Sequence, residues 1–328
     1  IIGLKGRFVF EAPGIAILMT AHRALEESVL TDKQNVVKSK IGQEWVDLVY
    51  KGFYFEPLRE NLEAFLTDSQ KLVTGEVIGT YGIAEDSHQA TEENIQVNIS
   101  ADKLNGIKIA VPDAGMASHM IVVAKSSQGI ELRLVNLKDS SIAITPQKNI
   151  DTSKSFYKVE FNNTPSTLLG QHGEGWNYIQ HLLDQAAVLF AFEQVGGSQA
   201  ALDMAKAYSL ERFAFGRQIG SYQAIKHKLA DMYISITLAK SNAYYAAWAL
   251  STESSDLSVA SATARVSSTK AFQFCSKENI QTHGGNGFTW EYDCHLFYRR
   301  SKLLSVNLGS LSNWKNRLVT GLEKSNVS

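Results

Sequence analysis

The stretch LERFAFGRQIGSYQAIKHKLADM, residues 210–232, is the part of the sequence that indicates the fold of this chain most strongly. A second stretch, IQTHGGNGFTWE, follows at residues 280–291. The guanidinium of Arg212 has the forked shape that binds pyrophosphate oxygens. The pair Gly284-Gly285 lets backbone N–H groups come close to a ligand, because no Cβ stands in the way. Together the two stretches favour a cofactor site on a helical scaffold.

Both stretches resemble the flavin-contacting signatures of the acyl-CoA dehydrogenase family, and they stand at the distance that this family requires. The resemblance covers the chain from about Gly75 onward. It implies an α+β fold, with an N-terminal helical segment, a middle β-barrel-like domain and a C-terminal four-helix bundle. It also implies FAD as cofactor, with the ring held by one chain and the ADP arm gripped by the bundle of a neighbour. The matching grip positions are Arg212, Phe215, Gln223, Gln281, Gly284 and Gly285.

The hydrophobic pattern divides the chain into three parts. Residues 1–76 carry helical spacing and are expected to form a short or divergent N-terminal helical domain. Residues 77–165 carry short β-branched runs at 95–99, 107–111, 120–123, 130–134, 142–144 and 157–161, separated by Asn-Gly, Gln-Gly and Asp-Ser turns. Residues 166–328 return to helical spacing, and the predicted bundle helices are 176–208, 222–250, 257–282 and 293–322.

Composition narrows the classes of partner. The 328 residues are 44% hydrophobic with a formal net charge of -1, and no basic run is present, which argues against nucleic acid. The longest apolar run, Ala186 to Phe192, is far shorter than the roughly 20 residues of a membrane span, and we expect a cytoplasmic protein without a membrane partner. Cys275 and Cys294 are expected to be buried free thiols rather than a disulfide. The histidines have no metal-ligand spacing, so no metal is predicted.

The resemblance places a catalytic glutamate at one of two positions, and this chain has neither. Leu308 stands where the commoner base is found, and Ala186 stands at the alternative position. Neither side chain accepts a proton. Asp184 and Glu193 lie nearby on the same predicted helix, so a relocated base is an open alternative.

The wall that holds the flavin ring differs as well. The family has an aromatic, an aliphatic and a threonine residue where this chain has Ala110, Val111 and Pro112. Alanine cannot stack on a ring, and proline has no hydroxyl or N–H to donate. The upstream loop of backbone donors is reduced to Ala84 through His88.

These losses predict a chain without catalytic residues of its own. We expect a subunit of a heteromeric acyl-CoA dehydrogenase with α2β2 composition, as the paired enzymes of the family imply. This subunit is expected to hold the ADP arm of the FAD of a homologous partner. The expected substrate is an acyl-CoA, the expected electron acceptor is an electron-transfer flavoprotein, and residues 287–296 look most like the branch that acts on steroid side chains. Two alternatives are an active homo-oligomeric dehydrogenase or oxidase with a relocated base, and a scaffold protein without flavin.

Overall fold

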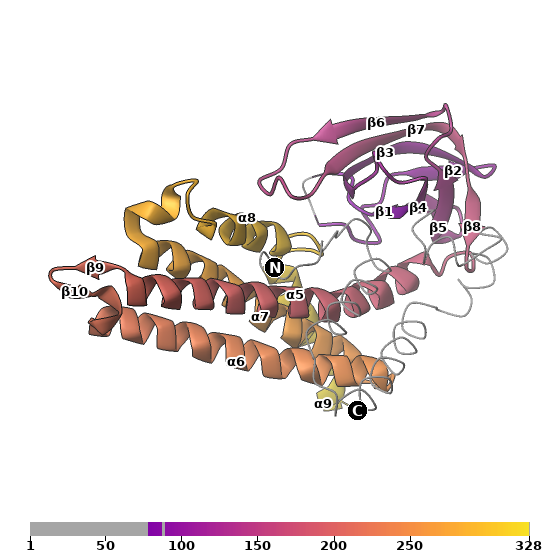
Figure 1. The fold of residues 1–328 in the computed structure, drawn as a ribbon. Coiled ribbons are helices and arrows are strands. Elements are labelled where there is room, and N and C mark those ends of the chain that lie inside the picture. The colour runs from indigo at the N-terminus through magenta and orange to yellow at the C-terminus, as the bar shows by residue number, and fades with distance from the viewer. Residues whose placement is uncertain (1–77, 87–88, 328) are drawn as a thin grey trace, which may run out of the picture. The chain divides into compact units, whose positions relative to one another are not determined.

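The computed structural model describes residues 78–86 and 89–327 (Figure 1). The helical domain expected over residues 1–76 lies outside the described residues. The described chain divides between Leu182 and Leu183 into two compact units, here called the β unit and the helical unit. Strands come first and long helices follow, which confirms the predicted α+β fold.

The β unit contains one eight-stranded sheet. Its path runs β6-β7-β3-β2-β4-β5-β8, and β1 pairs in parallel with β4. Five of the six predicted runs fall inside strands, whereas 95–99 overlaps β2 only at its end, and β1 and β8 were not predicted. The strands are β1 (Gly79–Gly82), β2 (Asn98–Ser100), β3 (Lys103–Pro112), β4 (His119–Ser126), β5 (Gly129–Asn136), β6 (Ile142–Gln147), β7 (Phe156–Pro165) and β8 (Thr167–Leu169).

One predicted turn is wrong. Asn105 and Gly106 lie inside β3, and the turn before that strand is formed by Ala101 and Asp102, which both have positive φ. Two residues with positive φ between antiparallel strands are typical of a type I′ hairpin. Gly106 serves a different purpose, since a Cβ there would stand 3.0 Å from the backbone of Val97. The glycine therefore permits close approach of a neighbouring strand.

The helical unit is built on three long helices, of which α5 begins in the β unit and continues past Leu183. They are α5 (Gly175–Glu211), α6 (Gln223–Ser251) and α7 (Leu257–His283) (Figure 1). Between α5 and α6 lie a two-stranded hairpin, β9 (Phe213–Ala214) and β10 (Arg217–Gln218), and the short η2 (Ile219–Ser221). After α7 come η3 (Gly284–Phe288), α8 (Cys294–Leu304) and α9 (Leu311–Val327).

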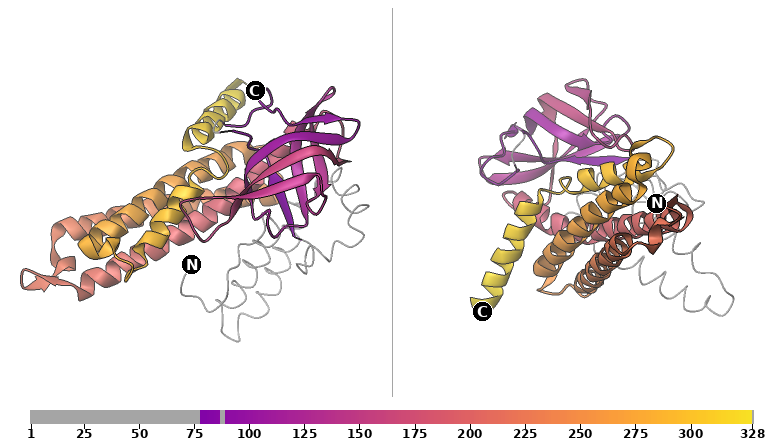
Figure 2. Two further views of the ribbon diagram at one scale, coloured as in Figure 1. Left: turned by 90° about the horizontal axis from the view of Figure 1, so that it is seen from above. Right: turned by 90° about the vertical axis from the view of Figure 1, so that its left-hand side faces the viewer.

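The predicted fourth bundle helix, 293–322, is two helices. The chain leaves α8 after Leu304 and resumes as α9 at Leu311, and Figure 2 shows that α8 and α9 point in different directions. Gly309 lies between them with φ of 98°, a conformation that no helix contains. The apolar spacing continues through this break, and for that reason the pattern did not reveal it.

Small side chains let the long helices pack closely. The buried stripe of α6 consists largely of alanines, and α7 contributes Ala260, Ala264 and Ala271 to the same core. Alanine favours the helix and adds little bulk between two backbones. The backbones of α6 and α7 can therefore approach each other closely across this core.

Both cysteines match their prediction. Cys275 and Cys294 are free and buried, and burial raises the pKa of the Cys275 thiol to about 12 and of the Cys294 thiol to about 11. Neither thiol is ionised near neutral pH, so both act as small apolar groups. Among the described residues, no helix is long and apolar enough to cross a membrane.

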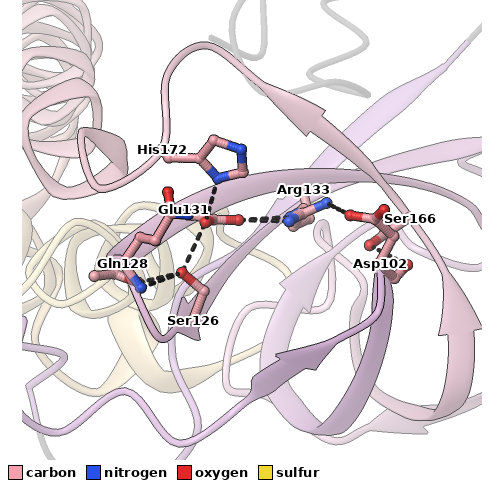
Figure 3. Close-up of polar contacts among 8 residues, drawn as sticks. Asp102, Ser126, Gln128, Glu131, Arg133, Ser166 and His172 are labelled. Carbon is pink, nitrogen blue, oxygen red and sulfur yellow. Dashed lines mark hydrogen bonds and ion pairs between the residues drawn. The ribbon is translucent and has the colours of Figure 1, made fainter.

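A buried carboxylate organises one end of the β unit (Figure 3). Glu131 is 1% exposed and accepts hydrogen bonds from Ser126 Oγ at 2.7 Å and Arg133 Nε at 2.9 Å, and its Oε1 lies 2.7 Å from His172 Nδ1. Arg133 also donates to Asp102 Oδ1 at 2.7 Å. Burial acts to raise the pKa of Glu131, but the hydrogen bonds from His172, Ser126 and Arg133 outweigh it and hold the pKa below its usual value. The cluster joins the loop before α5 to the sheet.

Replacing Glu131 by Gln is expected to destabilise the protein at neutral pH by about 3–5 kcal/mol, because Arg133 keeps its buried charge, loses its buried carboxylate partner and retains only the exposed Asp102. A carboxylate whose pKa is lowered on folding stabilises the native state above its ordinary value of 4.5, and this stability is lost as pH falls through the lowered pKa. The wild type should therefore lose stability below pH 4.5 more steeply than the variant does. Urea unfolding from neutral to acidic pH checks this, with Glu160→Gln, a half-buried carboxylate paired with Lys158, as control. Parallel pH curves for wild type and Glu131→Gln would contradict it.

Candidate functional site

The predicted grip residues gather at one end of the helical unit. Arg212 follows directly after α5, Phe215 lies in the β9–β10 turn, and Gln223 opens α6 (Figure 1). Gln281 lies in the last turn of α7, and the two glycines begin η3. The end of α7 lies beside the end of α5, because Asn286 Nδ2 donates to the hydroxyl of Tyr208 at 3.0 Å. Segments about 70 positions apart are thus brought together.

The polar grip side chains are open to a ligand. Arg212, Gln223 and Gln281 are all exposed. Within the described part of the chain, their side chains make no hydrogen bond or ion pair. A cation and two amides that are exposed together at one end match the donors that a phosphate-bearing ligand requires.

The two glycines leave an open surface. A Cβ on Gly284 or on Gly285 would meet no atom within 4 Å. Gly284 has φ of 60°, which by itself favours glycine. Gly285 has no such conformation, so neither its backbone nor a described neighbour requires glycine there. The missing Cβ leaves room for a group from outside this chain.

Phe215 is held away from its own chain. The residue is 97% exposed and has φ of 51°, a costly conformation for an aromatic residue. The side chain of Tyr222 stabilises the turn. Its hydroxyl donates to Ala214 O at 3.0 Å, and the Arg217 guanidinium carbon lies 3.9 Å from the centre of its ring. A hairpin that holds an exposed phenylalanine in a strained backbone conformation is typical of a surface that contacts another molecule.

The two expected base positions lie in one closed apolar cluster. Leu308 is 6% exposed, and it packs with Ala187, Ala262 and Trp314, while Ala186 lies against the same cluster. Trp314 is 1% exposed, and its indole N–H donates to Leu308 O at 3.0 Å. The region where a base would stand is therefore filled by apolar side chains, with a tryptophan that the sequence analysis missed.

The alternative bases are occupied by ion pairs. Arg317 Nη2 lies 2.6 Å from Asp184 Oδ1, which also accepts from Ser261 Oγ at 2.9 Å. Arg300 donates to Glu193 Oε1, with Nε at 2.8 Å and Nη2 at 2.7 Å. Asp184 links α5 to α7 and α9, and Glu193 links α5 to α8. These contacts use one oxygen of each carboxylate and give both residues a structural role.

The segment at the expected flavin wall contacts its own chain. Ala110 has φ of 50° at a bulge in β3, and its N–H donates to Gln147 Oε1 at 2.8 Å. Pro112 O accepts from Thr80 Oγ1 at 2.5 Å. The side chain of Val111 is fully buried in the core of the β unit. None of these three residues offers a side-chain donor to a ring.

Glu85, in the reduced loop upstream, has a role inside the β unit. Its carboxylate accepts from Gln96 N at 2.6 Å and Val97 N at 3.0 Å, and Lys108 Nζ lies 2.6 Å away. Burial lowers the pKa of Lys108 to about 8, although Glu85 acts in the opposite direction. The pair fixes the loop to β3.

The sequence did not predict that Trp314 packs against the two expected base positions. One signal was present, because Trp314 and Arg317 stand three residues apart and so share a helix face. The Arg317 guanidinium carbon lies 5.0 Å from the centre of the Trp314 ring while Arg317 also binds Asp184. A tryptophan and an arginine on that face pointed to a packed contact.

Comparison with known families separates the chain into two parts. Residues 173–313 match the model of the acyl-CoA dehydrogenase C-terminal domain, and residues 1–82 match that of the argininosuccinate synthase C-terminal domain. Argininosuccinate synthase of Xanthomonas campestris is 60% identical over 77 residues, which are 24% of this chain and 19% of that protein. The front segment thus resembles a different family from the one whose helical domain was expected over residues 1–76.

The remainder of the chain resembles dehydrogenases. Acyl-CoA dehydrogenase IpdE2 of Mycobacterium tuberculosis is 38% identical over 120 residues, or 37% of this chain and 36% of that protein. Butyryl-CoA dehydrogenase of Megasphaera elsdenii has a similar fold, with a TM-score of 0.72 and 24% identity over 77% of this chain and 70% of that one. A solved steroid acyl-CoA dehydrogenase, Tcur3481-Tcur3483, gives a TM-score of 0.70 and 24% identity over 79% and 70%.

The chain covers only part of its first relatives, about a fifth of the argininosuccinate synthase and about a third of IpdE2. The C-terminal family model and the similar dehydrogenases agree with the fold that the signature residues implied. Behind a front segment that matches argininosuccinate synthase, residues 173–313 of this chain match the C-terminal domain of the acyl-CoA dehydrogenases.

Proposed function

We propose that this chain is a catalytically silent subunit of a heteromeric, FAD-dependent acyl-CoA dehydrogenase. In this proposal a homologous partner supplies the glutamate base and the ring site, and this chain holds the ADP arm of the partner's FAD. The complex would be an oxidoreductase that desaturates an acyl-CoA thioester between Cα and Cβ. Residues 77–165 and 166–328 would be its middle β domain and C-terminal bundle.

One contrast carries the proposal. The side chains that serve a neighbour's cofactor, above all Arg212, are exposed and bind no described residue, whereas the positions that serve the chain's own chemistry, Leu308 and Ala186, pack into an apolar cluster. A homo-oligomer with this sequence would hold FAD arms without any base. The combination makes sense when the neighbour is a different chain.

The proposed roles follow from the chemistry of each side chain. Bound FAD would supply the hydride acceptor. The guanidinium of Arg212 would fork onto the pyrophosphate, and the amides of Gln223 and Gln281 would donate and accept at polar atoms of the arm. The backbone at Gly285 would approach the arm closely, and Phe215 would supply an apolar contact.

The rival functions have less support. An active homo-oligomer would need Asp184 or Glu193 as base, and both are held by arginines. A scaffold without flavin would have no use for an exposed cation at the same end of the helical unit as a glycine that packing does not explain. The grip therefore favours the silent subunit over both.

The outer face of α6 supports association with other chains. Ile234, Leu238, Tyr245 and Trp248 are exposed and recur at spacings of four, seven and three residues, so they form one stripe, here called the α6 stripe. Each member stands two positions after a residue of the buried stripe, or about 200° round the helix. The α6 stripe therefore faces away from the core of its own unit, as an interface of the proposed α2β2 complex would.

Placing a charge at Leu238 and at Trp248 together is expected to disrupt the complex, because two carboxylates would lose their hydration inside an interface. Leu238→Glu/Trp248→Glu should release most of this chain from its partner while the subunit stays folded. Size-exclusion chromatography with light scattering checks the mass. The exposed Asn316→Glu on α9 is the matched control, and an unchanged mass for the double variant would exclude this face as the interface.

For the substrate we propose an acyl-CoA with a steroid side chain, oxidised with an electron-transfer flavoprotein as acceptor. Residues 287–296 suggested this branch, and similarity to a steroid acyl-CoA dehydrogenase supports it.

Expression with and without a partner tests the proposed function. The chain alone should hold FAD only weakly, through the ADP arm, so that it loses flavin on purification and shows no acyl-CoA-dependent bleaching. Co-expression with a homologous chain that carries the glutamate should restore both flavin retention and bleaching. A yellow, active single chain would contradict the proposal, and a chain that stays colourless with every dehydrogenase partner would favour the scaffold.

A further inference from the structure

The grip is made of two halves that the chain does not join directly. Arg212, Phe215 and Gln223 belong to the turn between α5 and α6, whereas Gln281 and the glycine pair belong to the end of α7 and to η3. A ligand that touches both halves needs them at a fixed spacing, since small misplacements cost much of the binding energy. Something must therefore hold the end of α5 against the end of α7.

Three aromatic rings pack together at this junction. The ring of Tyr208, one turn before Arg212, stacks on the ring of His283 with centroids 4.1 Å apart and planes 25° apart. Tyr292 packs edge-on against both, with centroids 5.6 Å from Tyr208 and 5.3 Å from His283. We call these three residues the aromatic clamp. Offset stacks and edge contacts are the favoured arrangements of aromatic rings.

The clamp is fixed from both sides. His283 is 4% exposed, and its Nδ1 lies 2.8 Å from Asn279 O. A carbonyl only accepts, so Nδ1 carries the proton and donates. From the other side, Asn286 Nδ2 donates to the Tyr208 hydroxyl at 3.0 Å. The histidine is thereby tied to α7, and the tyrosine is tied to η3.

The fixed histidine immediately precedes the glycine pair. Gly284 leaves the helix with φ of 60°. A Cβ on Gly287 would stand 2.6 Å from Ile280 O and 3.2 Å from the Cβ of His283, so η3 packs directly on the end of α7. η3 therefore packs against the last turn of α7, which carries His283, and the ring of His283 lies on Tyr208.

We propose that the aromatic clamp is a positioning element of the nucleotide grip: Tyr208, His283 and Tyr292 hold the Arg212 half and the Gly284-Gly285 half at the spacing that an ADP moiety requires. The inference rests on the proposed function. The residues of the aromatic clamp touch no ligand themselves. They position the backbone that carries Arg212 and the glycine pair, which would contact the ligand.

The test uses the full chain without a partner and ADP as the probe. Tyr208→Leu removes a ring and keeps an apolar side chain, and Tyr208→Phe keeps the ring and removes the hydroxyl. Asn286→Ala removes only the bond to that hydroxyl, at a half-buried position that tolerates the change. Tyr298→Leu, a half-buried tyrosine of α8 outside the clamp, is the matched control, and Arg212→Ala is the reference for lost contact. Hydrogen–deuterium exchange of residues 284–288 and titration calorimetry with ADP are the two measurements.

The clamp predicts that Tyr208→Leu speeds exchange at residues 284–288 and weakens ADP binding, each by roughly threefold to tenfold. Tyr208→Phe and Asn286→Ala should speed exchange and weaken ADP binding by smaller factors. Tyr298→Leu should leave the exchange rate and the ADP affinity unchanged. Arg212→Ala should weaken ADP binding without faster exchange. If Arg212→Ala weakens binding and Tyr208→Leu and Asn286→Ala do not, the clamp is excluded and the grip stands. If the wild type binds no ADP, both the clamp and the proposed function fail. Should Tyr208→Leu not fold, Asn286→Ala and Tyr208→Phe decide by the same two measurements.

Discussion

Replacing Arg212 by Ala should strip flavin from the assembled complex, even though the proposal places this residue far from the thioester. The guanidinium would lose a charge-assisted contact to phosphate, which is worth about 1.5–3 kcal/mol, or roughly ten- to a hundred-fold in affinity. Activity should fall with flavin content and return when excess FAD is added. Flavin absorbance after stepwise dilution measures the loss.

Lys226 provides the matched control for Arg212. It is an exposed cation in the first turn of α6 and has no role in the proposed grip. Lys226→Ala should keep its flavin under the same dilution. Equal flavin retention by Arg212→Ala and by the wild type would mean that the exposed arginine is a solvated helix-end cation and that the grip is only a family remnant.

Restoring a glutamate at Leu308 is expected to produce a less stable protein and no enzyme. Trp314 and its neighbours fill the surroundings of Leu308, so the carboxylate must draw in water or stay protonated. Either outcome should lower the free energy of unfolding by about 1–3 kcal/mol. A base alone also lacks a positioned hydride acceptor, and positioning supplies much of the rate in such reactions.

Urea unfolding and an acyl-CoA bleaching assay test this prediction. Ala186→Glu should behave in the same way, and Val319→Glu on the exposed side of α9 should stay within about 0.5 kcal/mol of the wild type. If either glutamate variant, purified alone and supplied with FAD, oxidises an acyl-CoA, this chain contains a usable active site and the silent-subunit proposal must be abandoned.

The sequence predicted those features that depend on local pattern. Alternating β-branched runs identified most strands, and helical spacing identified α5, α6 and α7 within a few residues at each end. The break between α8 and α9 was not predicted, because Gly309 interrupts a helical pattern that continues on both sides. The turn at Ala101 and Asp102 was not predicted either, since Ala101 has no preference for positive φ and the neighbouring Asn105-Gly106 has the sequence of a turn.

The candidate site also has a part that local sequence predicted and a part that depends on tertiary contacts. The signature stretches identified the grip positions, and the helical unit brings these residues to one end. What filled the missing base positions depended on a tertiary contact, because Trp314 arrives from a helix more than 120 positions after Ala186. The same holds for Asp184 and Glu193. The positions of Arg317 and Arg300 reveal that these acids are ion-paired.

Flavin stoichiometry tests the central claim most directly. In a complex where this chain lends its grip and has no ring site, each pair of unlike chains should hold about one FAD. Acid release of flavin, quantified against the mass of the complex from native mass spectrometry, gives this ratio. One flavin per pair, lost with Arg212→Ala of this chain, is the result that the account predicts. One flavin per chain would mean that this subunit holds a ring of its own, and would contradict it.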